Sequence, residues 1–447
     1  MPGAEYERLK GLLQTVLETV AELDGRATGF VQRASKVTAV LFVQVLVLGC
    51  WQERVTKLVD LVQVGRRLGV QVSIPGLNQR INGAAVRLLQ AVLRAALTGG
   101  QQATVAGCAI FQRFAAVYLQ DSTYVSLPAG LAGQLAGSGG NASAAGAKVV
   151  LNYEYRKGVI AALDVVSGRT PDQRCRQTLP LAARGSLHIF DLGFYALALL
   201  SQLAGEGSYF LCRHQFQTVL YSAGAGATAQ RLDLLATLKQ YFRQHSTETV
   251  WEFAALLGAQ TRIPVRIVVA RLPATIVAKR RRRIRANAQR RSTTPATLTL
   301  ALAEWNIFCT NVPAATWSAE QVLAAYRIRW QVELLFKLFK SQAGLDCIDN
   351  WRPERVLCFF YARLIALVLT QQLTAPLRFP SNRELSLPKA FHLLQHAIAQ
   401  LRHIIAHRWR GFRPWLAAFV ADSSALALKD KHATLPSTYQ SLCELNA

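Results

Sequence analysis

Three acidic residues in this sequence stand where they could hold metal ions. Asp121 follows VYLQ, a run with the β-branched and aromatic bias of a strand, and Asp191 follows LHIF, so we expect each at the end of a β-strand, whereas Glu333 lies in a predicted helix. Mg²⁺ prefers hard carboxylate ligands, and two such ions about 3.5–4 Å apart can activate a nucleophile and stabilise the leaving oxygen of a phosphodiester. Since the chain has only 26 acidic residues, these three form a candidate ligand set for phosphodiester chemistry.

Glu333 belongs to a stretch from Trp317 to Leu345 that reads as one long amphipathic helix. A capping box of Ser318 and Gln321 predicts that this helix begins near Ala319. At about 100° per residue, one face collects a tyrosine, three cations and a lone carboxylate. These residues are Tyr326, Arg329, Glu333, Lys337 and Lys340. The stripe is either a solvated polar face or a metal ligand whose neighbours hold phosphates.

Composition and charge favour an ordered protein with a polyanionic partner. Hydrophobic residues make up 51% of the chain and charged residues 17%, and 51 Lys and Arg against 26 Asp and Glu give a net charge of +25. Nucleic acid is the partner that such a balance predicts, and a membrane surface is the alternative.

Neither a membrane span nor a secretion signal is indicated. The longest nearly apolar runs, 37–49 and 358–370, are shorter than the ~20 residues that cross a bilayer, so we predict buried helices. The first residues, MPGAEYERLK, lack the pattern of a signal peptide, which predicts a cytoplasmic protein. Eight scattered cysteines without a CxxC pair indicate reduced thiols rather than a zinc ribbon or disulfides.

Residues 1–105 read as a helical N-terminal domain for DNA binding. Helices are expected at 5–23, 34–51, 53–68 and 84–97. Within this region a short helix, a turn at Gly69 and a second helix at 77–80 resemble a helix-turn-helix. Asn78, Gln79 and Arg80 are therefore candidate DNA contacts, with ordinary surface polarity as the alternative.

Residues 106–213 have the alternating pattern of a first segment of an α/β core. A Gly-, Ala- and Ser-rich stretch at 129–148 predicts a mobile loop, and a hairpin is expected to turn at Arg156–Gly158. A strand at 208–212 leads to Arg213. Asp191 stands between a strand and a helix, which is where open α/β sheets bind ligands.

Residues 214–304 are predicted to be a β-rich insertion, and residues 305–345 the end of the core. Strands in IPVRIVVARLP and TPATLTLALAEWNIFCTNVP flank a run of eight cations from Lys279 to Arg291. Such a run is solvated, and beside DNA it contacts phosphates. Its first five members are the candidates: Lys279, Arg280, Arg281, Arg282 and Arg283.

Residues 346–447 form a predicted helical C-terminal region for DNA contact or dimerisation, with helices at 353–373, 383–406 and 414–428. Four histidines share one face of the second helix, His392, His396, His403 and His407. This spacing occurs in metal sites. Because an apolar stripe occupies the opposite face, we interpret the histidines as a solvated or phosphate-facing stripe.

These motifs together resemble bacterial insertion-sequence transposases of the DDE, RNase H-like type. The spacing Tyr326-x2-Arg329-x3-Glu333-x6-Lys340 is similar to their YREK signature. Asp121-Ser-Thr and Asp191-Leu-Gly-Phe resemble the two aspartate motifs, and residues 309–313, CTNVP, the strand that returns from the insertion. The resemblance covers roughly 105–345 and keeps the order of the motifs, although the loop after Asp121 is longer and plainer than we expect.

The resemblance implies an α/β fold with an RNase H-like mixed sheet, a β-rich insertion and helical flanking regions. Asp121, Asp191 and Glu333 would bind two Mg²⁺ ions, for which Mn²⁺ can substitute. Tyr326, Arg329 and Lys340 would hold transposon-end phosphates, and Arg213 is a further candidate DNA contact. Trp305, with Trp330 as a second candidate, would stack on an unpaired base, as in relatives that cut through a hairpin. Strand packing is the alternative role of Trp305.

The resemblance therefore predicts a transposase acting on double-stranded DNA, both its own element's ends and target DNA. It would bind the terminal inverted repeats, pair two ends as a homodimer, cleave them and join the 3′-OH ends to the target, by cut-and-paste with hairpins as the favoured route. One alternative is a non-catalytic DNA-binding protein descended from a transposase, which predicts a damaged triad. Another is a nuclease without strand transfer, which the sequence does not distinguish from a transposase.

Overall fold

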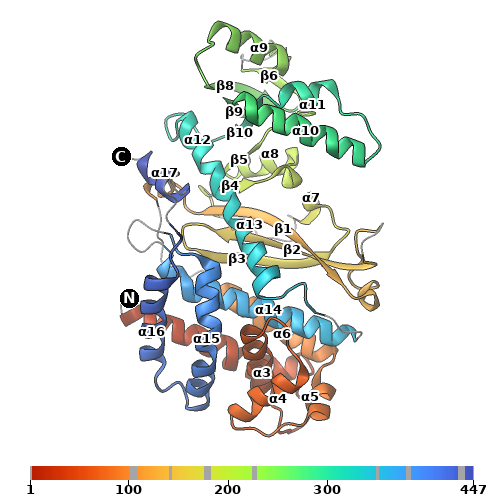
Figure 1. Cartoon of the computed structure of the whole chain (residues 1–447), viewed down its shortest axis with the longest axis vertical. Coiled ribbons are helices and arrows are strands. Elements are labelled where there is room, and N and C mark those ends of the chain that lie inside the picture. Colours follow the sequence, from red (N-terminus) through yellow and green to blue (C-terminus); the bar gives the residue numbers. More distant parts are fainter. Residues whose placement is uncertain are drawn as a thin grey trace. The chain divides into compact units, whose positions relative to one another are not determined.

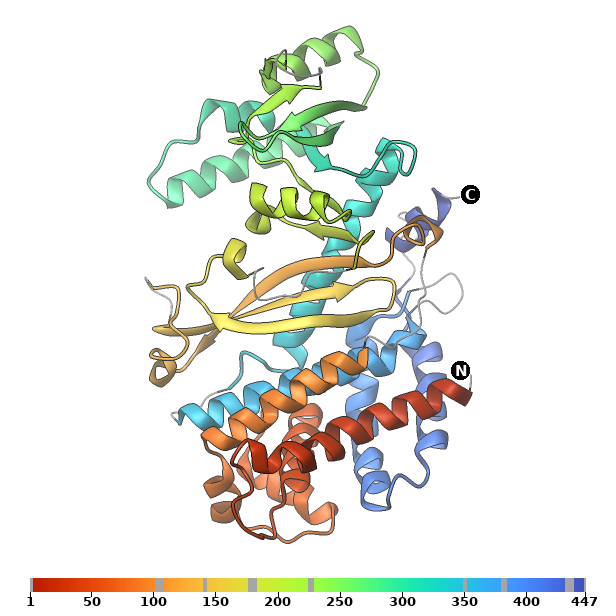
Figure 2. The ribbon, with the colours of Figure 1, turned by 180° about the vertical axis from the view of Figure 1, so that it is seen from behind.

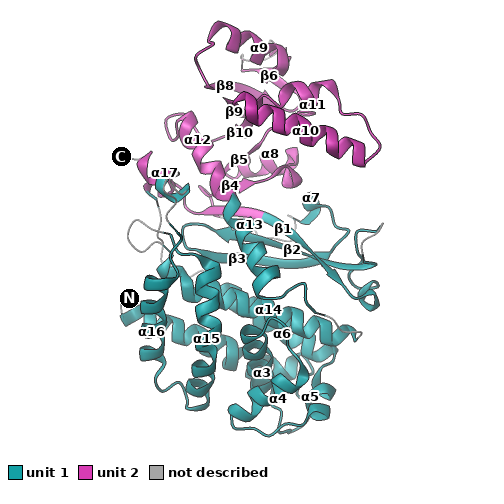
Figure 3. Ribbon diagram, viewed as in Figure 1, with its two compact units in different colours: residues 1–108, 121–180, 330–440 teal, residues 109–120, 181–329, 441–447 magenta. Residues whose placement is uncertain are grey.

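The computed structural model describes residues 3–100, 108–139, 143–175, 183–223, 229–348, 352–378, 384–430 and 438–445 (Figure 1). The chain forms two compact units (Figure 3). Unit 1 contains residues 1–108, 121–180 and 330–440, and unit 2 contains residues 109–120, 181–329 and 441–447.

The amino-terminal part of unit 1 is helical, as predicted. Its elements are α1 (Gly3–Gln14), the π-helical η1 (Thr15–Thr19), α2 (Val20–Ala27), α3 (Ala39–Gln52), α4 (Leu58–Arg67), α5 (Ile74–Arg80) and α6 (Gly83–Gly100). The sequence of α3, AVLFVQVLVLGCWQ, is apolar on all sides, and the helix is correspondingly buried along nearly its whole length. Thr38 caps it by accepting a hydrogen bond from the Leu41 amide at 3.1 Å.

The carboxy-terminal helices complete the core of unit 1. They are α14 (Pro353–Thr374), the 3₁₀ turn η9 (Ala375–Leu377), α15 (Leu387–Ala406) and α16 (Phe412–Leu426). Figure 2 shows α6 and α14 side by side, and Gln372 Nε2 donates to the Ala96 carbonyl at 2.6 Å. The segment Pro353–Leu377 is long and apolar enough to cross a membrane, but its most apolar window is entirely buried inside the protein. It is therefore the core helix that the sequence predicted. The last helix, α17 (Thr438–Glu444), runs from unit 1 into unit 2.

Three strands form the part of the sheet that belongs to unit 1, in the order β3-β2-β1, where β1 is Val117–Leu127 and contributes residues 121–127 to this unit. The predicted hairpin is confirmed, since β2 (Ala145–Glu154) and β3 (Val159–Ser167) pair antiparallel around a turn that ends at Gly158. Gly158 has φ +71°, which a residue without Cβ adopts at little cost. Because β2 begins at Ala145, the predicted loop 129–148 is shorter than expected. It contains the 3₁₀ turn η3 (Ala129–Leu131), and residues 140–142 lie outside the described ranges.

Unit 2 begins with the 3₁₀ turn η2 (Ala109–Phe111) and is built on a mixed sheet. Its strands follow the order β1 (Val117–Leu127, of which 117–120 belong to this unit), β4 (Leu187–Phe190), β5 (Tyr209–Arg213), β10 (Trp305–Thr310), β9 (Ile263–Arg271), β8 (Val250–Leu257), β6 (Leu220–Ser222) and β7 (Arg231–Leu232). β1, β4 and β5 are parallel, and the remaining pairings are antiparallel. The parallel step from β4 to β5 is made through α8 (Leu197–Gly205), as such a crossover requires. The chain thus has the predicted mixed α/β fold with helical regions at both ends.

The segment between β5 and β10 is less β-rich than predicted. It carries α9 (Leu234–Gln244), α10 (Ala274–Arg290) and α11 (Thr297–Leu302) besides its strands. The cation run lies on α10 except for Arg291, its C-cap residue, and TLTLAL forms α11, so the expectation of a strand before Trp305 was wrong. Intrinsic strand preference is weak, and packing overrides it here.

The long helix that carries Glu333 is divided into four segments rather than one. They are α12 (Ala319–Tyr326), the 3₁₀ turn η7 (Arg327–Arg329), α13 (Trp330–Lys337) and the π-helical η8 (Leu338–Gln342). The predicted start is confirmed, because Ser318 and Gln321 form the capping box. The uniform 100° spacing was wrong, since 3₁₀ and π turns rotate each residue by a different angle.

Candidate functional site

Asp121 and Asp191 occupy different positions on their strands. Asp191 follows the last residue of β4, as predicted. Asp121 is the fifth of the eleven residues of β1, so its placement at a strand end was wrong. The strand continues to Leu127, with β2 as its other neighbour in the sheet. However, the parallel pairing of β1 with β4 ends at Gln120 and Phe190, and each aspartate is the residue directly after this pair.

Asp121 stands beside a polar cluster that the sequence did not reveal. Its Oδ1 accepts from the Ser122 amide at 2.8 Å, and Ser122 Oγ donates to Asp172 Oδ1 at 2.8 Å. Lys148 Nζ lies 2.8 Å from the same Asp172 oxygen and 2.7 Å from the Thr170 carbonyl. Lys148 therefore forms its ion pair with Asp172. The only sequence signal was the serine directly after Asp121.

Asp191 meets the tyrosine of the predicted signature. The hydroxyl of Tyr326 donates to Asp191 Oδ1 at 3.5 Å, and its ring lies 4.7 Å from the ring of Phe308. Two guanidinium groups approach the same ring, Arg213 at 5.8 Å and Arg329 at 5.9 Å. Burial, and then the charge of Asp191, raise the pKa of Tyr326, so this phenol remains a proton-bearing donor at neutral pH.

Glu333 lies on α13 in unit 1, half-buried. One turn earlier Trp330 is exposed, and the Lys337 ammonium lies 5.1 Å from its ring centroid. Lys337, which belongs to the charged stripe but not to the YREK signature, therefore has a cation–π contact with Trp330. Lys340 is half-buried on the π-helical segment η8.

The three carboxylates come from both units. Asp121 and Glu333 belong to unit 1 and Asp191 to unit 2. Within the described ranges, no three His, Cys, Asp or Glu side chains are grouped so that they could hold a metal ion. The donors themselves fit Mg²⁺ or Mn²⁺, because all three are hard oxygen ligands.

A basic cavity of about 480 Å³ lies in unit 2. One of its lining residues, Leu192, directly follows Asp191 in the sequence. Its walls include Leu192 and four of the predicted DNA contacts, Arg213, Arg280, Arg283 and Trp305. No acidic side chain is among the described residues that line it. We call this cavity the arginine pocket.

In the arginine pocket, Arg280 is hydrogen-bonded to neutral groups. Arg280 donates to the Asn306 side chain at 2.5 Å and to the Trp305 carbonyl at 3.3 Å. Burial and the nearby charge of Arg213 lower the pKa of Arg280. Two like charges held together in a partly desolvated place favour an anion between them.

The other members of the cation run have different surroundings. Arg281 pairs with Glu304 at 2.7 Å and donates to the Leu300 carbonyl at 3.0 Å, so it fastens α10 to the segment before β10. Lys279 and Arg282 are exposed on α10. Arg281 therefore stabilises the fold, whereas Lys279 and Arg282 lie at the surface. The sequence did not distinguish these roles.

Trp305 is 4% exposed and lies 6.3 Å from the ring of Phe242 in a stacked arrangement. Trp305 therefore packs within the fold, its alternative role, and also forms part of the wall of the arginine pocket.

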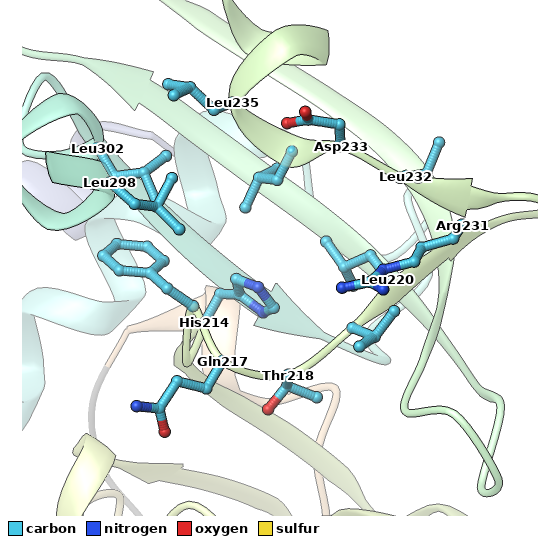
Figure 4. A pocket seen from close by; sticks show the side chains of 13 residues that line it. His214, Gln217, Thr218, Leu220, Arg231, Leu232, Asp233, Leu235, Leu298 and Leu302 are labelled. Atoms are coloured by element: carbon cyan, nitrogen blue, oxygen red, sulfur yellow. The ribbon is translucent and has the colours of Figure 1, made fainter. Parts of the chain in front are cut away.

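A second cavity of about 400 Å³ adjoins the arginine pocket, sharing His214, Phe216 and Leu302 with it (Figure 4). Burial lowers the pKa of His214 to about 4, so its imidazole is neutral at physiological pH. Arg231 and Asp233 also line the cavity, and their opposite charges cancel. The positive charge that no lining acidic residue balances is therefore in the arginine pocket.

The helix-turn-helix candidate in unit 1 contains α4 and α5, but one of its polar residues is engaged internally. Asn78 Oδ1 accepts from Arg352 at 3.0 Å and from Arg355 at 2.5 Å. Arg80 is half-buried, with its guanidinium 5.8 Å from the ring of Phe30. Gln79 is exposed. The structure thus assigns a structural contact to Asn78.

Comparison with known proteins gives one family. Residues 112–369 match the family model described as "Transposase DDE domain". The chain is 29% identical over 348 residues to the transposase for insertion sequence element IS231E of Bacillus thuringiensis subsp. finitimus, covering 73% of this chain and 72% of that protein. It is 26% identical over 424 residues to the IS231B transposase of B. thuringiensis subsp. berliner, covering 89% and 86%.

A relative that matches over a shorter stretch and one solved structure are also similar to this chain. The putative transposase InsL for IS186A of Escherichia coli K12 is 33% identical over 118 residues, covering 26% of this chain and 32% of that protein. A piggyBac transposase synaptic complex with hairpin DNA has a TM-score of 0.48 at 9% identity, covering 97% of this chain and 86% of that one.

Proposed function

Because the chain belongs to the Transposase DDE domain family, which makes it a DNA transposase, we propose that it moves its own insertion-sequence element by cut-and-paste. In this proposal it binds the terminal inverted repeats, hydrolyses the phosphodiester at each end and joins the 3′-OH ends to target DNA. Excision proceeds through hairpins, on a homodimer that pairs two ends, in the cytoplasm at the nucleoid.

The observation that carries the proposal is the family match over residues 112–369, which include Asp121, Asp191 and Glu333. Asp121 directly follows Gln120 and Asp191 directly follows Phe190, the last pair between β1 and β4. Asp121 and Asp191, with Glu333 from α13 as the third, form the proposed ligand set for two Mg²⁺ ions.

Metal ions bound there would activate the attacking hydroxyl and stabilise the leaving 3′ oxygen. The protein's own groups bind and orient the DNA. Tyr326 stays neutral, and its hydrogen bond orients the Asp191 carboxylate. Arg329 and Lys340 take transposon-end phosphates beside the cleavage point.

In the arginine pocket, Arg213, Arg280 and Arg283 bind DNA phosphates, and Trp305 in its wall is one candidate for stacking on an unpaired base. The second candidate is Trp330, which is exposed on α13 in unit 1. More distant phosphate contacts come from Lys279, Arg282 and Arg80, whereas Arg281 serves the fold. In domain terms, residues 1–105 bind DNA, 106–213 and 305–345 make the catalytic core, 214–304 are the insertion, and 346–447 serve DNA contact or dimerisation.

The test uses linear DNA with candidate element ends, Mg²⁺ and four single variants. Asp121→Asn, Asp191→Asn and Glu333→Gln should abolish cleavage while DNA binding persists. Glu206→Gln, an exposed acid at the end of α8, is the matched control and should cleave normally. Joined products support transposition. Cleavage without joining identifies a nuclease, DNA binding without cleavage identifies a non-catalytic protein, and full activity of Glu333→Gln overturns the site.

A further inference from the structure

The histidine stripe of α15 and its C-cap residue consists of two pairs with different geometry. His392, His396, His403 and His407 are all exposed, on the side opposite the buried Leu394, Ile398, Leu401 and Ile405. Each pair has the i, i+4 spacing that brings two side chains of a helix together. The DNA chemistry proposed above uses neither pair.

The first pair has the separation of a chelating site. His392 Nε2 and His396 Nε2 are 3.2 Å apart, and the two rings are nearly perpendicular, at 87°. Two imidazole nitrogens on one tetrahedral zinc ion, each at 2.0–2.1 Å, are about 3.3–3.4 Å apart. The nitrogen atoms thus already stand at the distance that a shared ion would impose.

We propose that His392 and His396 bind one divalent transition-metal ion, Zn²⁺, Ni²⁺ or Cu²⁺, through both Nε2 atoms. Both side chains are exposed, so an ion reaches them from solvent and keeps water at its remaining positions. In the metal-free pair one Nε2 carries the proton of the N–H···N contact. Binding moves this proton to Nδ1 of the same ring, so both rings remain neutral ligands.

The second pair is arranged differently. His407 Nδ1 donates to the His403 carbonyl at 2.8 Å, and the two rings lie 4.0 Å apart with 38° between their planes. Rings that face each other in this way direct their in-plane lone pairs alongside one another rather than toward one point. His403 and His407, of which His407 is the C-cap residue of α15, therefore provide a control with the same residue types and spacing.

The proposed site differs in chemistry from the three carboxylates. Imidazole suits zinc, nickel and copper, whereas carboxylates suit Mg²⁺ and Mn²⁺. Excess Mg²⁺ therefore occupies oxygen sites and leaves the histidine pair for a softer ion. Acid removes the ion, because protons compete with the metal for the imidazole nitrogens and a protonated imidazole is not a ligand.

The experiment is calorimetric titration of the untagged full chain with NiCl₂ or ZnCl₂ in excess Mg²⁺ at neutral pH. One binding event is expected for the unaltered protein, and His396→Gln should weaken it about tenfold or more. His407→Gln should bind as the unaltered protein does, and both variants should keep the unaltered circular dichroism spectrum, since the positions are exposed. Cu²⁺ electron paramagnetic resonance should show two coupled nitrogens, reduced to one in His396→Gln. Absence of binding, unchanged binding in His396→Gln, or equal loss in His407→Gln would overturn the proposal.

Discussion

Replacing Arg283 by Gln should weaken DNA binding in a way that depends on salt. Arg283 is exposed on α10 and lines the arginine pocket, where no described acidic side chain cancels its charge. A lysine or arginine that neutralises one phosphate contributes about 0.9 to the slope of log K against log salt concentration. If one contact is lost, the gain in DNA affinity between 1 M and 0.1 M salt should be about eightfold smaller for the variant than for the unaltered protein. This factor corresponds to about 1.2 kcal/mol.

The matched control for this prediction is Arg281→Gln, two residues away on the same helix. Its charge is paired with Glu304 and its side chain fastens α10, so its loss should reduce stability but leave the salt slope nearly unchanged. The assay is fluorescence anisotropy of a labelled element end between low and high salt, with chemical denaturation of each variant. Equal changes of the salt slope in both variants would refute the conclusion that Arg283 binds DNA phosphate while Arg281 stabilises the fold.

Three further predictions concern single side chains. Between pH 6.5 and 4 the unfolded chain protonates His214 while the folded chain does not, so the free energy of unfolding should fall by about 3 kcal/mol as pH drops through this window. In urea unfolding, His214→Gln should lack this pH-dependent loss of stability. Tyr326→Phe keeps the ring on Phe308 but removes the donor to Asp191, so the cleavage rate should drop by up to about tenfold with an unchanged Tm, whereas an unchanged rate would deny the hydroxyl a role. Ser318→Ala removes the cap of α12 and should cost ~1 kcal/mol in denaturant unfolding, while no loss would mean that the capping box is dispensable.

Features encoded by neighbouring residues could be predicted from the sequence. The Ser318–Gln321 capping box fixed the start of α12, and the apolar run LHIF fixed the strand that ends before Asp191. Both depend on contacts within a few residues, so the pattern contains the information. The apolar sequence of α3 likewise predicted its burial.

Features that depend on distant partners could not be predicted. The strand through Asp121 continues to Leu127 and has β2 as a neighbour in the sheet, and β2 begins only at Ala145. The sequence TLTLAL has strand character by composition, yet it is α11. The breaks at Arg327–Arg329 and Leu338–Gln342 leave an amphipathic pattern nearly intact, so periodicity did not reveal them.

The partners of the arginines in unit 2 give a physical reason to expect an anionic ligand. A surface that needs cations only for solubility can pair them with carboxylates, as Arg281 is paired with Glu304. Arg280 is instead held by an amide oxygen and a carbonyl oxygen, and Arg213 lies against the ring of Tyr326. These partners fix the position of the guanidinium groups without cancelling their charge. Holding like charges together costs free energy in the isolated protein, and a phosphate placed between them recovers it.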